Sequence, residues 1–288
     1  MANGMTQGSP VLDRSSKTSF NFSDRDFHFI VKFIGEHAGI VMSDAKRDLI
    51  YGRLAPRLRK LQLTDFSDYC NILKSGDREE IELFTNALTT NLTSFFREQH
   101  HFDFLQKELI PALVKNKTSR TLRVWSAGCS TGEEPYSIAM AVSEVLPAGW
   151  DFRLLATDLD SNVVNTAAQG IYKQERVEGM KKPLLKRWFH RGTGSNEGMV
   201  KVRPELKKFI SFKQLNLLSN WPMKGSFDFI FCRNVVIYFD KSTQAVLFDR
   251  FAQQLDPSGH LFIGHSETLN NVSDRFSLIG NTIYHRAT

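Results

Sequence analysis

The sequence predicts an α/β fold, with helices packed on a parallel sheet, preceded by an all-helical N-terminal domain. Three observations predict this class. Apolar residues in the first third of the chain recur with a helical period and show no strand pattern. After about residue 120, short apolar strands alternate with helices, as in βαβ units. A chain of 288 residues, 41% of them hydrophobic, is long enough for one large or two modest domains.

The N-terminal part divides into a polar stretch, 1–19, and a helical domain, 20–90. The polar stretch is rich in Ser, Gly and Thr, which is typical of disorder. Ser23, Ser43 and Thr64 are each placed to cap a helix that begins just after them. These helices predict a small bundle.

A fourth helix is predicted at about 78–88. The second helix, at about 43–60, is strongly basic. Pro56 lies inside the apolar pattern of the second helix, which either weakens the prediction of a helix there or implies a kink. The positive charge of the second helix is explained either by a solvated helix face or by an acidic partner. The basic residues are Lys46, Arg47, Arg53, Arg57, Arg59 and Lys60.

The α/β part begins with the strand RTLRVWSAG and the helix GEEPYSIAMAVSEVL. The further strands are DFRLLATDLD, FDFIFCRN and HLFIGH, and the further helices are SNVVNTAA and STQAVLFDRFAQQL. This alternation implies a parallel sheet with right-handed crossovers. The C-terminal RFSLIGNTIYHRA predicts an antiparallel hairpin around a Gly-Asn turn.

A Gly-rich segment interrupts the alternation of strands and helices. Its sequence is RWFHRGTGSNEGMVKVRPELKKFISF, with short β-like runs on both sides of the glycines. The segment is too long for a simple strand–helix connection. We therefore expect a small antiparallel β insertion at about 188–206.

The composition excludes several classes of protein. The net charge of +6 and the pI of about 9.2 favour an acidic partner, which nucleic acid, anionic lipid or an acidic protein surface would each provide. The three cysteines are odd in number and far apart, so neither a disulfide framework nor a zinc site is indicated. No apolar run reaches about 18 residues and no secretory signal is visible, so we expect a cytoplasmic protein.

The turn after the first strand, VWSAGCSTGEEPYS, is a candidate nucleotide site. Gly128 and Gly132 permit a tight turn and the close approach of a ligand, although a plain strand–helix turn could contain them too. Glu133 and Glu134 occupy the first turn of the next helix. Acids at a helix N-terminus interact favourably with the helix dipole, which is the simpler explanation for these two glutamates. They would also repel a pyrophosphate. A ligand that is cationic at this turn, as S-adenosylmethionine is, suits them better.

Polar residues follow two further strands. Asp158 ends the second strand, where an acid can accept hydrogen bonds from both ribose hydroxyls. Nicotinamide enzymes use the same arrangement, so Asp158 supports a nucleoside without separating the two cofactors. The alternative role is a helix cap, which Asp160 is placed to provide. Arg233, Asn234 and Tyr238 follow a later strand and are expected at the same edge of the sheet.

The segment TTNLTSFFRE, 89–98, joins the helical part to the α/β part. It is either a linker with Ser and Thr caps or part of a site. Adjacent Phe95 and Phe96 followed by Arg97 favour a site, because a plain linker has little use for them. We expect this segment to pack into the cleft between domains, where small-molecule sites are common.

Four motifs together resemble the chemotaxis receptor methyltransferases, the CheR family. They are LTTNLTSFFRE, WSAGCSTGEEPYSIAM, FCRNVVIYFD and PSGHLFIGHSE, in the order found in that family. The resemblance runs from about residue 22 to the C-terminus. It implies a linker, 91–97, that contributes to the site. It also implies a Rossmann-like S-adenosylmethionine methyltransferase domain, 98–288, which carries the β insertion.

The resemblance also implies roles for individual residues. Arg97 and Tyr238 correspond to catalytic positions that face the transferred methyl group and the incoming carboxylate. No metal ligand is implied. The implied cofactor contacts are Asn91, Thr93 and Arg97 at the methionine end, Glu134 near the ammonium, Asp158 at the ribose, Asn216 and Leu217 beside adenine, and Arg233 and Asn234.

Members of this family transfer a methyl group from S-adenosylmethionine to glutamate carboxylates of membrane chemoreceptors, which gives methyl esters and S-adenosylhomocysteine. The resemblance therefore implies the cytoplasmic region of a chemoreceptor as partner, through its methylation helices and its C-terminal pentapeptide. We expect a monomer, no nucleic-acid partner and no membrane insertion. The implied receptor-binding residues are Arg53, Arg57 and Arg59 on the basic helix and Gly192, Thr193 and Gly194 in the β insertion.

Three other classes of function remain open from the residues alone. A nucleic-acid methyltransferase would suit the positive charge, but the chain has neither an N-P-P-Y motif nor a Pro-Cys pair. A non-catalytic adaptor would not need Asp158, the glycine turn and Arg97 together. A nicotinamide dehydrogenase conflicts with the two glutamates at the phosphate-binding turn.

Overall fold

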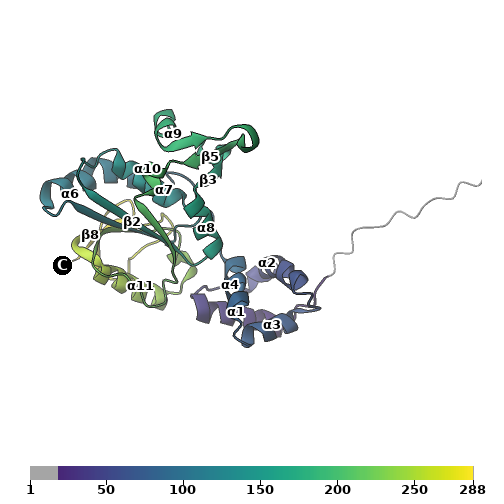
Figure 1. Cartoon of the computed structure of the whole chain (residues 1–288). Coiled ribbons are helices and arrows are strands. Elements are labelled where there is room, and N and C mark those ends of the chain that lie inside the picture. The colour runs from purple at the N-terminus through teal and green to yellow at the C-terminus, as the bar shows by residue number, and fades with distance from the viewer. Residues whose placement is uncertain (1–18, 288) are drawn as a thin grey trace, which may run out of the picture.

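The computed structural model describes residues 19–287, and the segment expected to be disordered lies outside them except for Ser19. The described chain forms a helical bundle near the N-terminus and a larger α/β part (Figure 1). Within residues 19–287, no helix is both long enough and apolar enough to cross a membrane.

The helical bundle begins at the predicted cap. The Ser23 side chain accepts a hydrogen bond from the N–H of Asp26, and the Asp26 carboxylate accepts one from the N–H of Ser23. The third helix is capped by Asp65 rather than by Thr64, because the Asp65 carboxylate reaches the N–H of Asp68. The elements are α1 (Asp24–Ala38), η1 (Asp44–Lys46), α2 (Arg47–Lys60), α3 (Phe66–Lys74) and α4 (Arg78–Leu88).

The basic helix α2 is preceded by the short 3-10 helix η1. Ser43 lies before η1, and its side chain makes no capping hydrogen bond there. α2 continues through Pro56, which is exposed, as is Gly52 one turn earlier. Water can therefore reach the Gly52 carbonyl, which loses its helical donor to the proline. The opposite face of α2 buries Ile50 and Leu54 in the bundle core.

The α/β part is built on one mixed sheet with the strand order β6-β2-β1-β7-β8-β10-β9. The first five strands in this order run parallel. β10 pairs antiparallel with both β8 and β9, which confirms the predicted C-terminal hairpin. The strands are β1 (Thr121–Ala127), β2 (Asp151–Asp158), β6 (Ile210–Gln214), β7 (Phe227–Cys232), β8 (Leu255–Ile263), β9 (Phe276–Gly280) and β10 (Ile283–Arg286).

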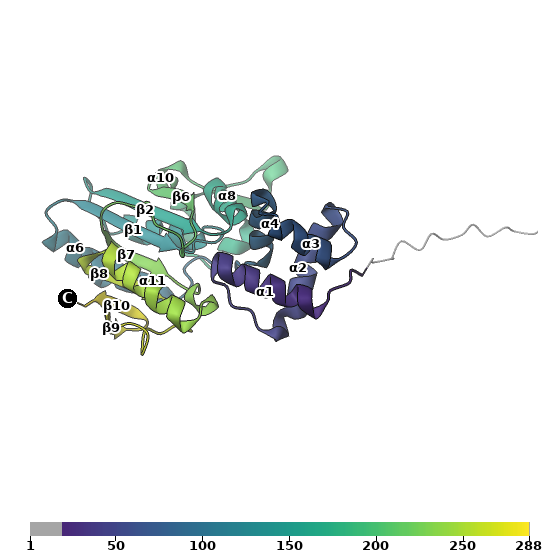
Figure 2. The ribbon, with the colours of Figure 1, turned by 90° about the horizontal axis from the view of Figure 1, so that it is seen from below.

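Helices cover both faces of this sheet (Figures 1 and 2). One face packs against α5 to α7 and the other against α11. β1 serves both cores, because Val124 points to the first face and Trp125 to the second. The helices are α5 (Gln99–Phe104), the π-helical η2 (Leu105–Leu109), α6 (Ile110–Asn116), α7 (Glu133–Ser143), α8 (Ser161–Gln169), η5 (Val236–Tyr238) and α11 (Lys241–Gln254).

A small antiparallel sheet, ordered β3-β5-β4, projects from the α/β part (Figure 1). It includes β3, which precedes the range of about 188–206 expected for the insertion. The FISF run, residues 209–212, lies just beyond that range and contributes to β6, which pairs in parallel with β2 in the main sheet. The remaining elements are β3 (Ile171–Lys173), η3 (Gln174–Val177), α9 (Lys182–Trp188), β4 (Phe189–Arg191), η4 (Gly194–Asn196), β5 (Met199–Val202) and α10 (Pro204–Lys207).

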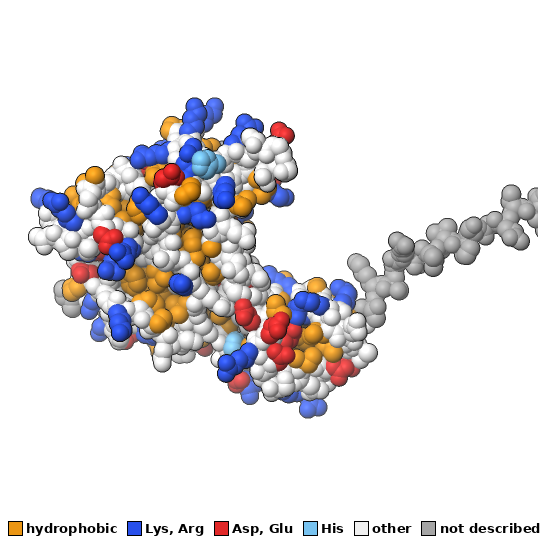
Figure 3. Space-filling model, viewed as in Figure 1, with side chains coloured by type: hydrophobic (Ala, Val, Ile, Leu, Met, Phe, Trp, Pro, Cys, Tyr) orange, Lys and Arg blue, Asp and Glu red, His pale blue; other side chains and the backbone are white. Residues whose placement is uncertain are grey.

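This small sheet and its helices carry most of the excess positive charge. Residues 171–208 hold eleven Lys and Arg against four Asp and Glu, whereas residues 20–90 hold ten against eleven. Figure 3 shows Lys and Arg side chains gathered over this part, at the top of the view. The basic stretch on α2 is therefore local, and the larger basic surface lies on the insertion.

Candidate active site

A cavity lies where the loops after β1, β2 and β7 face the helical bundle. Ligands of open α/β sheets bind at this edge. Its lining includes all ten residues that the sequence indicated for the cofactor and the chemistry. These are Asn91, Thr93, Arg97, Glu134, Asp158, Asn216, Leu217, Arg233, Asn234 and Tyr238.

The glycine turn after β1 forms one wall of the cavity. Gly128 and Gly132 have φ angles of 101° and 99°, which residues with a Cβ rarely adopt. A Cβ on Gly128 would also lie 2.3 Å from the Cγ2 of Val235, so glycine lets the loop after β7 approach. The N–H groups of Gly128 and Cys129 both donate to the carbonyl of Thr157 at 2.8 Å. These bonds fix the turn against the end of β2.

Asp158 ends β2 and lines the cavity. Its carboxylate accepts hydrogen bonds from the N–H of Ser130 at 2.8 Å and of Asp160 at 3.0 Å. Burial raises the pKa of Asp158 to about 6. Each carboxylate oxygen has two lone pairs, so both keep capacity for a ligand hydroxyl.

Asp160 is the helix cap that the sequence offered as an alternative. One carboxylate oxygen accepts from the N–H of Asn162 at 2.9 Å at the start of α8. The other accepts from the Thr89 hydroxyl at 3.0 Å and from Nδ2 of Asn91 at 2.9 Å. The carbonyl of Asn91 also accepts from the Ser130 hydroxyl at 3.0 Å. Asp160 therefore holds the linker against the cavity.

The two glutamates at the start of α7 have different partners. Glu134 lines the cavity, accepts from the Ser126 hydroxyl at 2.8 Å and lies 3.3 Å from Nη1 of Arg233. Burial raises the pKa of Glu134. Glu133 is fully buried and forms an ion pair with Arg176 of η3. Of these two glutamates, Glu134 is the one that can meet a cation in the cavity. The pairing of Glu133 with Arg176 was not predicted from the sequence.

Arg233 is a buried cation between two acids. Its guanidinium lies 3.3 Å from Glu134 and 3.4 Å from Glu98, and its Nη2 donates to the carbonyl of Arg97 at 2.5 Å. Glu98 also accepts from the backbone N–H and Nδ1 of His265 at 3.2 and 2.8 Å. Burial acts to raise the pKa of Glu98, but the bonds from His265 and the charge of Arg233 outweigh it and lower the pKa.

The backbone on both sides of Arg97 is strained. Phe96 and Glu98 have φ angles of 54° and 58°, in the left-handed region that costs residues with a Cβ about 1 kcal/mol or more. The Arg97 side chain donates from Nη1 to the carbonyl of Leu92 at 3.1 Å. The contacts of Arg233 and Glu98 therefore hold Arg97 in a conformation that the backbone alone would not favour.

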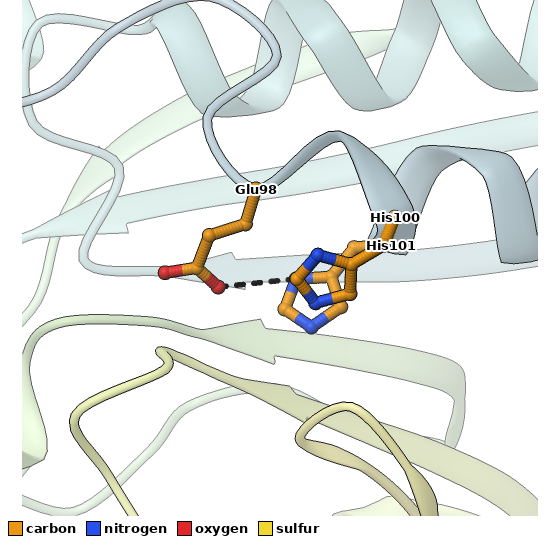
Figure 4. A group of neighbouring side chains, drawn as sticks. All are labelled: Glu98, His100 and His101. Carbon is orange, nitrogen blue, oxygen red and sulfur yellow. Dashed lines mark ion pairs between the residues drawn. The ribbon is translucent and has the colours of Figure 1, made fainter.

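His100 and His101 lie beside Glu98 (Figure 4). Nε2 of each imidazole lies 3.1 Å from the carbonyl oxygen of Asn281, and Nδ1 of His101 lies 3.6 Å from Glu98. Burial lowers the pKa of His101 to about 3, and Arg233 acts in the same direction. The three side chains have the ligand types of a metal site. Arg233 already supplies the positive charge at Glu98, and the two histidines join α5 to the turn between β9 and β10 through the Asn281 carbonyl.

Glu267 shapes the loop after β7. Its buried carboxylate accepts from the N–H of Asn234 at 2.9 Å and from those of Val235 and Val236 at 3.0 Å each. The N–H of Gly264 is a fourth donor, at 2.5 Å. Asn234 takes the left-handed φ of 59° in this loop. Glu267 ends the motif PSGHLFIGHSE, which is the only signal in the sequence that could have marked it.

The helical bundle supplies one wall of the cavity, through residues that the sequence analysis did not single out. The residues from this part that line the cavity are Ala38, Ile40, Val41, Met42, Lys46 and Leu49. The N–H of Val41 donates to the carbonyl of Tyr238 at 2.9 Å. Nδ2 of Asn216 donates to the carbonyl of His37 at 2.9 Å. The end of α1 is therefore tied to the rim of the sheet at two points.

Two of the arginines expected to bind a partner have internal roles. Nε and Nη2 of Arg57 donate to the buried carboxylate of Glu80 at 3.0 and 2.5 Å, and the Tyr69 hydroxyl donates to the same carboxylate at 2.8 Å. Arg57 is thus held by an ion pair inside the helical bundle, with its side chain 14% exposed. Nη1 of Arg53 donates to the carbonyls of Leu88 and Thr89, both at 2.7 Å. Arg53 thus supports the start of the linker.

The other expected partner residues lie outside the cavity lining, and all of them are exposed except Gly192, which is half-buried. Arg59 is exposed, with its guanidinium 5.8 Å from the ring centroid of Phe20. Thr193 and Gly194 lie at the exposed tip between β4 and β5. A Cβ on Gly192 would lie 1.9 Å from the carbonyl oxygen of Asn196, so this turn requires glycine at that position.

Comparison with known proteins gives one consistent family. Residues 91–285 match the family described as CheR methyltransferase, SAM binding domain, and residues 25–89 match CheR methyltransferase, all-alpha domain. A chemotaxis protein methyltransferase of Escherichia coli is 47% identical over 267 residues, which cover 91% of this chain and 91% of that protein. One from Salmonella typhimurium is 46% identical, with 91% and 90% covered. Chemotaxis protein methyltransferase 2 of Pseudomonas aeruginosa is 45% identical, with 96% and 97% covered.

Proposed function

The chain belongs to the CheR methyltransferase family, and from this premise we propose that its cavity transfers a methyl group from S-adenosylmethionine to glutamate carboxylates of a membrane chemoreceptor. The protein is an S-adenosylmethionine-dependent methyltransferase. The observation that carries the proposal is the joint lining of one cavity by Arg97, Glu134 and Asp158. Arg97 suits an acceptor anion, Glu134 suits the ammonium group of the ligand, and Asp158 suits its ribose.

The polar groups that line the cavity fit this cofactor. Glu134 is buried, and its pKa stays raised although Arg233 lies beside it, so a ligand cation would further offset the cost of its charge. We propose that the ribose meets Asp158 and that the methionine end meets Asn91, Thr93 and Arg97. Asn216 already bonds to the helical bundle through its side chain. We therefore propose that Asn216 and Leu217 flank adenine as a packed loop.

Asp158→Asn is expected to weaken S-adenosylmethionine binding about 10-fold. The amide keeps the shape of the carboxylate but loses the charge that strengthens hydrogen bonds from ribose hydroxyls, a difference on the order of 1.4 kcal/mol. Because burial raises the pKa of Asp158 to about 6, wild-type affinity should also fall as the pH drops from 7.5 to 5.5 and the carboxylate gains a proton. Titration calorimetry measures both effects.

The matched control for this variant is Asp274→Asn. Asp274 is exposed in the loop before β9 and does not line the cavity. The Asp274→Asn variant should leave the affinity for S-adenosylmethionine and the pH dependence of that affinity unchanged. An unaltered affinity in Asp158→Asn would remove this residue from the ribose site.

The proposed reaction needs no general base. A glutamate carboxylate is already ionised at neutral pH, since its ordinary pKa is about 4.3. The transfer is a displacement in which a carboxylate oxygen attacks the sulfonium methyl carbon and the sulfur leaves as a thioether, so the opposite charges of the two reactants are neutralised. Alignment is then the main contribution of the enzyme, and oriented reactants can account for roughly 7–11 kcal/mol. We propose that Arg97 and Tyr238 hold the carboxylate in line.

We propose that the receptor is contacted by the exposed part of the basic helix and by the insertion. Arg59→Glu is expected to raise the KM for receptor several-fold and to leave cofactor affinity unchanged, because Arg59 is exposed and outside the cavity. Arg53→Glu should instead change both the receptor KM and the cofactor affinity, since Arg53 supports the linker. Initial rates at varied receptor concentration measure these effects.

The control for charge reversal is Arg25→Glu, an exposed arginine on α1. It should leave the receptor KM as in the wild type. Equal effects of Arg59→Glu and Arg25→Glu would favour a solvated helix face over a binding surface.

The proposed function is tested by the transfer of labelled methyl groups to receptor-containing membranes and to RNA in parallel. We expect base-labile methyl esters on receptor glutamates and no label on RNA. Receptors that lack the C-terminal pentapeptide would test docking at Gly192, Thr193 and Gly194. Label on RNA alone would overturn the proposal. We also propose that the reaction takes place in the cytoplasm, where the cytoplasmic region of the receptor lies.

A further inference from the structure

The insertion, residues 171–208, reaches the linker through a cation that the proposed reaction does not use. Arg176 lies in η3, and its Nη2 donates to the carbonyl of Thr93 at 2.8 Å. The same nitrogen forms the ion pair with the carboxylate of Glu133. One guanidinium therefore joins three elements, which are the insertion, the linker and the first turn of α7.

Glu133 fixes the position of this guanidinium. The Glu133 side chain is 1% exposed, and Glu133 does not line the cavity. One of its carboxylate oxygens accepts from the Thr131 hydroxyl at 2.6 Å, and the other accepts from Arg176. A buried carboxylate without a cation is costly, so Glu133 holds Arg176 where it also reaches the linker.

Aromatic packing joins the same two segments. The ring of Phe95 stands nearly perpendicular to those of Tyr172 in β3 and Phe189 in β4, with centroids 5.1 and 5.6 Å away. Such edge-to-face pairs stabilise a contact beyond the area that they bury. The Tyr172 hydroxyl donates to the carbonyl of Thr131 in the glycine turn at 2.7 Å. The insertion thus contacts both the linker and the glycine turn, and each of these supplies residues to the cavity lining.

Arg176 holds the linker between two other anchors. The carbonyl of Asn91 accepts from a hydroxyl of the glycine turn at 3.0 Å, and the N–H of Phe96 donates to the Ser137 hydroxyl at 2.9 Å. The residues on both sides of Thr93 are exposed, so their packing does not fix the chain at this point. The hydrogen bond from Arg176 therefore sets how Thr93 faces the cavity, which it lines.

We propose that Arg176 is a positioning residue of the active site, which holds the linker in the shape that binds the methionine end of S-adenosylmethionine. The inference rests on the proposed contact of this end of the cofactor with the linker. It gives the insertion a role in cofactor binding that is separate from any contact with a receptor. It also gives the buried Glu133 a role, since Glu133 anchors the guanidinium.

The test removes the guanidinium in Arg176→Met, which keeps an unbranched apolar side chain. The Kd for S-adenosylmethionine, measured by titration calorimetry without a receptor, is expected to rise about tenfold. Arg176→Lys keeps a charge beside Glu133 and should give an intermediate Kd, because an ammonium is more strongly hydrated and suits a buried ion pair less well.

The matched control is Arg187→Met. Arg187 lies on α9 of the same insertion, pairs with Glu144 at 2.9 Å and lies outside the cavity lining. Its ion pair does not involve the linker, so the cofactor Kd should stay within about twofold of the wild-type value.

A double variant separates positioning from a purely structural role. Arg176→Met leaves Glu133 buried without its cation, which should lower the melting temperature. Adding Glu133→Gln removes that unpaired charge, so most of the lost melting temperature should return. The carbonyl of Thr93 still lacks its donor, so the Kd should remain raised about tenfold in the double variant.

Two results would overturn the positioning role. One is a cofactor Kd that returns to the wild-type value together with the melting temperature in the double variant. The other is an unchanged Kd in folded Arg176→Met. Because none of these measurements uses a receptor, they stand apart from the proposed function, which would instead fail if the wild type bound the cofactor and methylated no receptor.

Discussion

Arg97→Ala is expected to lower the turnover of receptor methylation about 100-fold. The guanidinium lines the cavity and is steered by the Leu92 carbonyl, so its loss removes the cation proposed to hold the acceptor. Charge-assisted hydrogen bonds contribute about 1.5–3 kcal/mol each, and a 1 Å misplacement of a reactant can cost about 100-fold in rate. Single-turnover transfer at saturating cofactor and receptor measures the chemical step directly.

Arg97→Lys provides the comparison for this loss. Lysine keeps the charge but cannot form the planar, two-point contact of a guanidinium with a carboxylate, so an intermediate rate is expected. Thermal melting should show both variants folded, because the strained backbone is held by Arg233 through the Arg97 carbonyl, which either variant retains. A near-wild-type rate for Arg97→Ala would remove Arg97 from the chemistry.

Arg233→Met is expected to reduce the free energy of unfolding by about 3–5 kcal/mol. The Arg233 side chain is 2% exposed and lies between Glu134 and Glu98, which are each 10% exposed. Removal of one partner from such a buried group leaves uncompensated charge, which is far costlier than loss of a surface pair. Urea unfolding monitored by circular dichroism measures the change.

The pH dependence of this deficit identifies its cause. Without Arg233, burial would hold the pKa of Glu134 further above its unfolded value of about 4.3, so the folded state would favour the protonated acid. The deficit should then be smaller at pH 5 than at pH 8. Arg153→Met, which removes an exposed pair with Asp151, should cost less than about 1 kcal/mol at both pH values. An equal deficit for Arg233→Met at pH 5 and pH 8 would contradict the buried-acid explanation.

The cavity was largely predictable because parallel strands bring their carboxyl ends to one edge. Asp158 and Arg233 are about 75 residues apart, yet each follows an apolar strand, so the strand pattern alone puts them at the same edge. The Gly128 turn was visible for the same reason. The linker residues were harder to predict as part of the site. The roles of Asn91 and Thr93 were inferred only from the resemblance to a family.

What stayed hidden depends on contacts between distant segments. Glu98 and Glu267 sit inside motifs that were recognised, but the partners that give them their roles lie on other elements. Arg57 looked like part of a basic face, because its buried partner Glu80 is 23 residues away on another helix. β6 was not recognised as a strand of the main sheet, because a short strand at the edge of a parallel sheet has no local mark that separates it from an antiparallel one.

The wall that the helical bundle gives to the cavity has a thermodynamic consequence. A ligand that fills a space shared by two parts of a chain binds fully only when those parts are in contact, so its binding stabilises that contact. At a ligand concentration 100 times Kd, this linkage is worth about 2.7 kcal/mol. The loop around Val41 and the linker around Asn91 would then be ordered by the methyl donor. The cellular supply of that donor would set both the rate of transfer and the rigidity of the surface that meets the receptor.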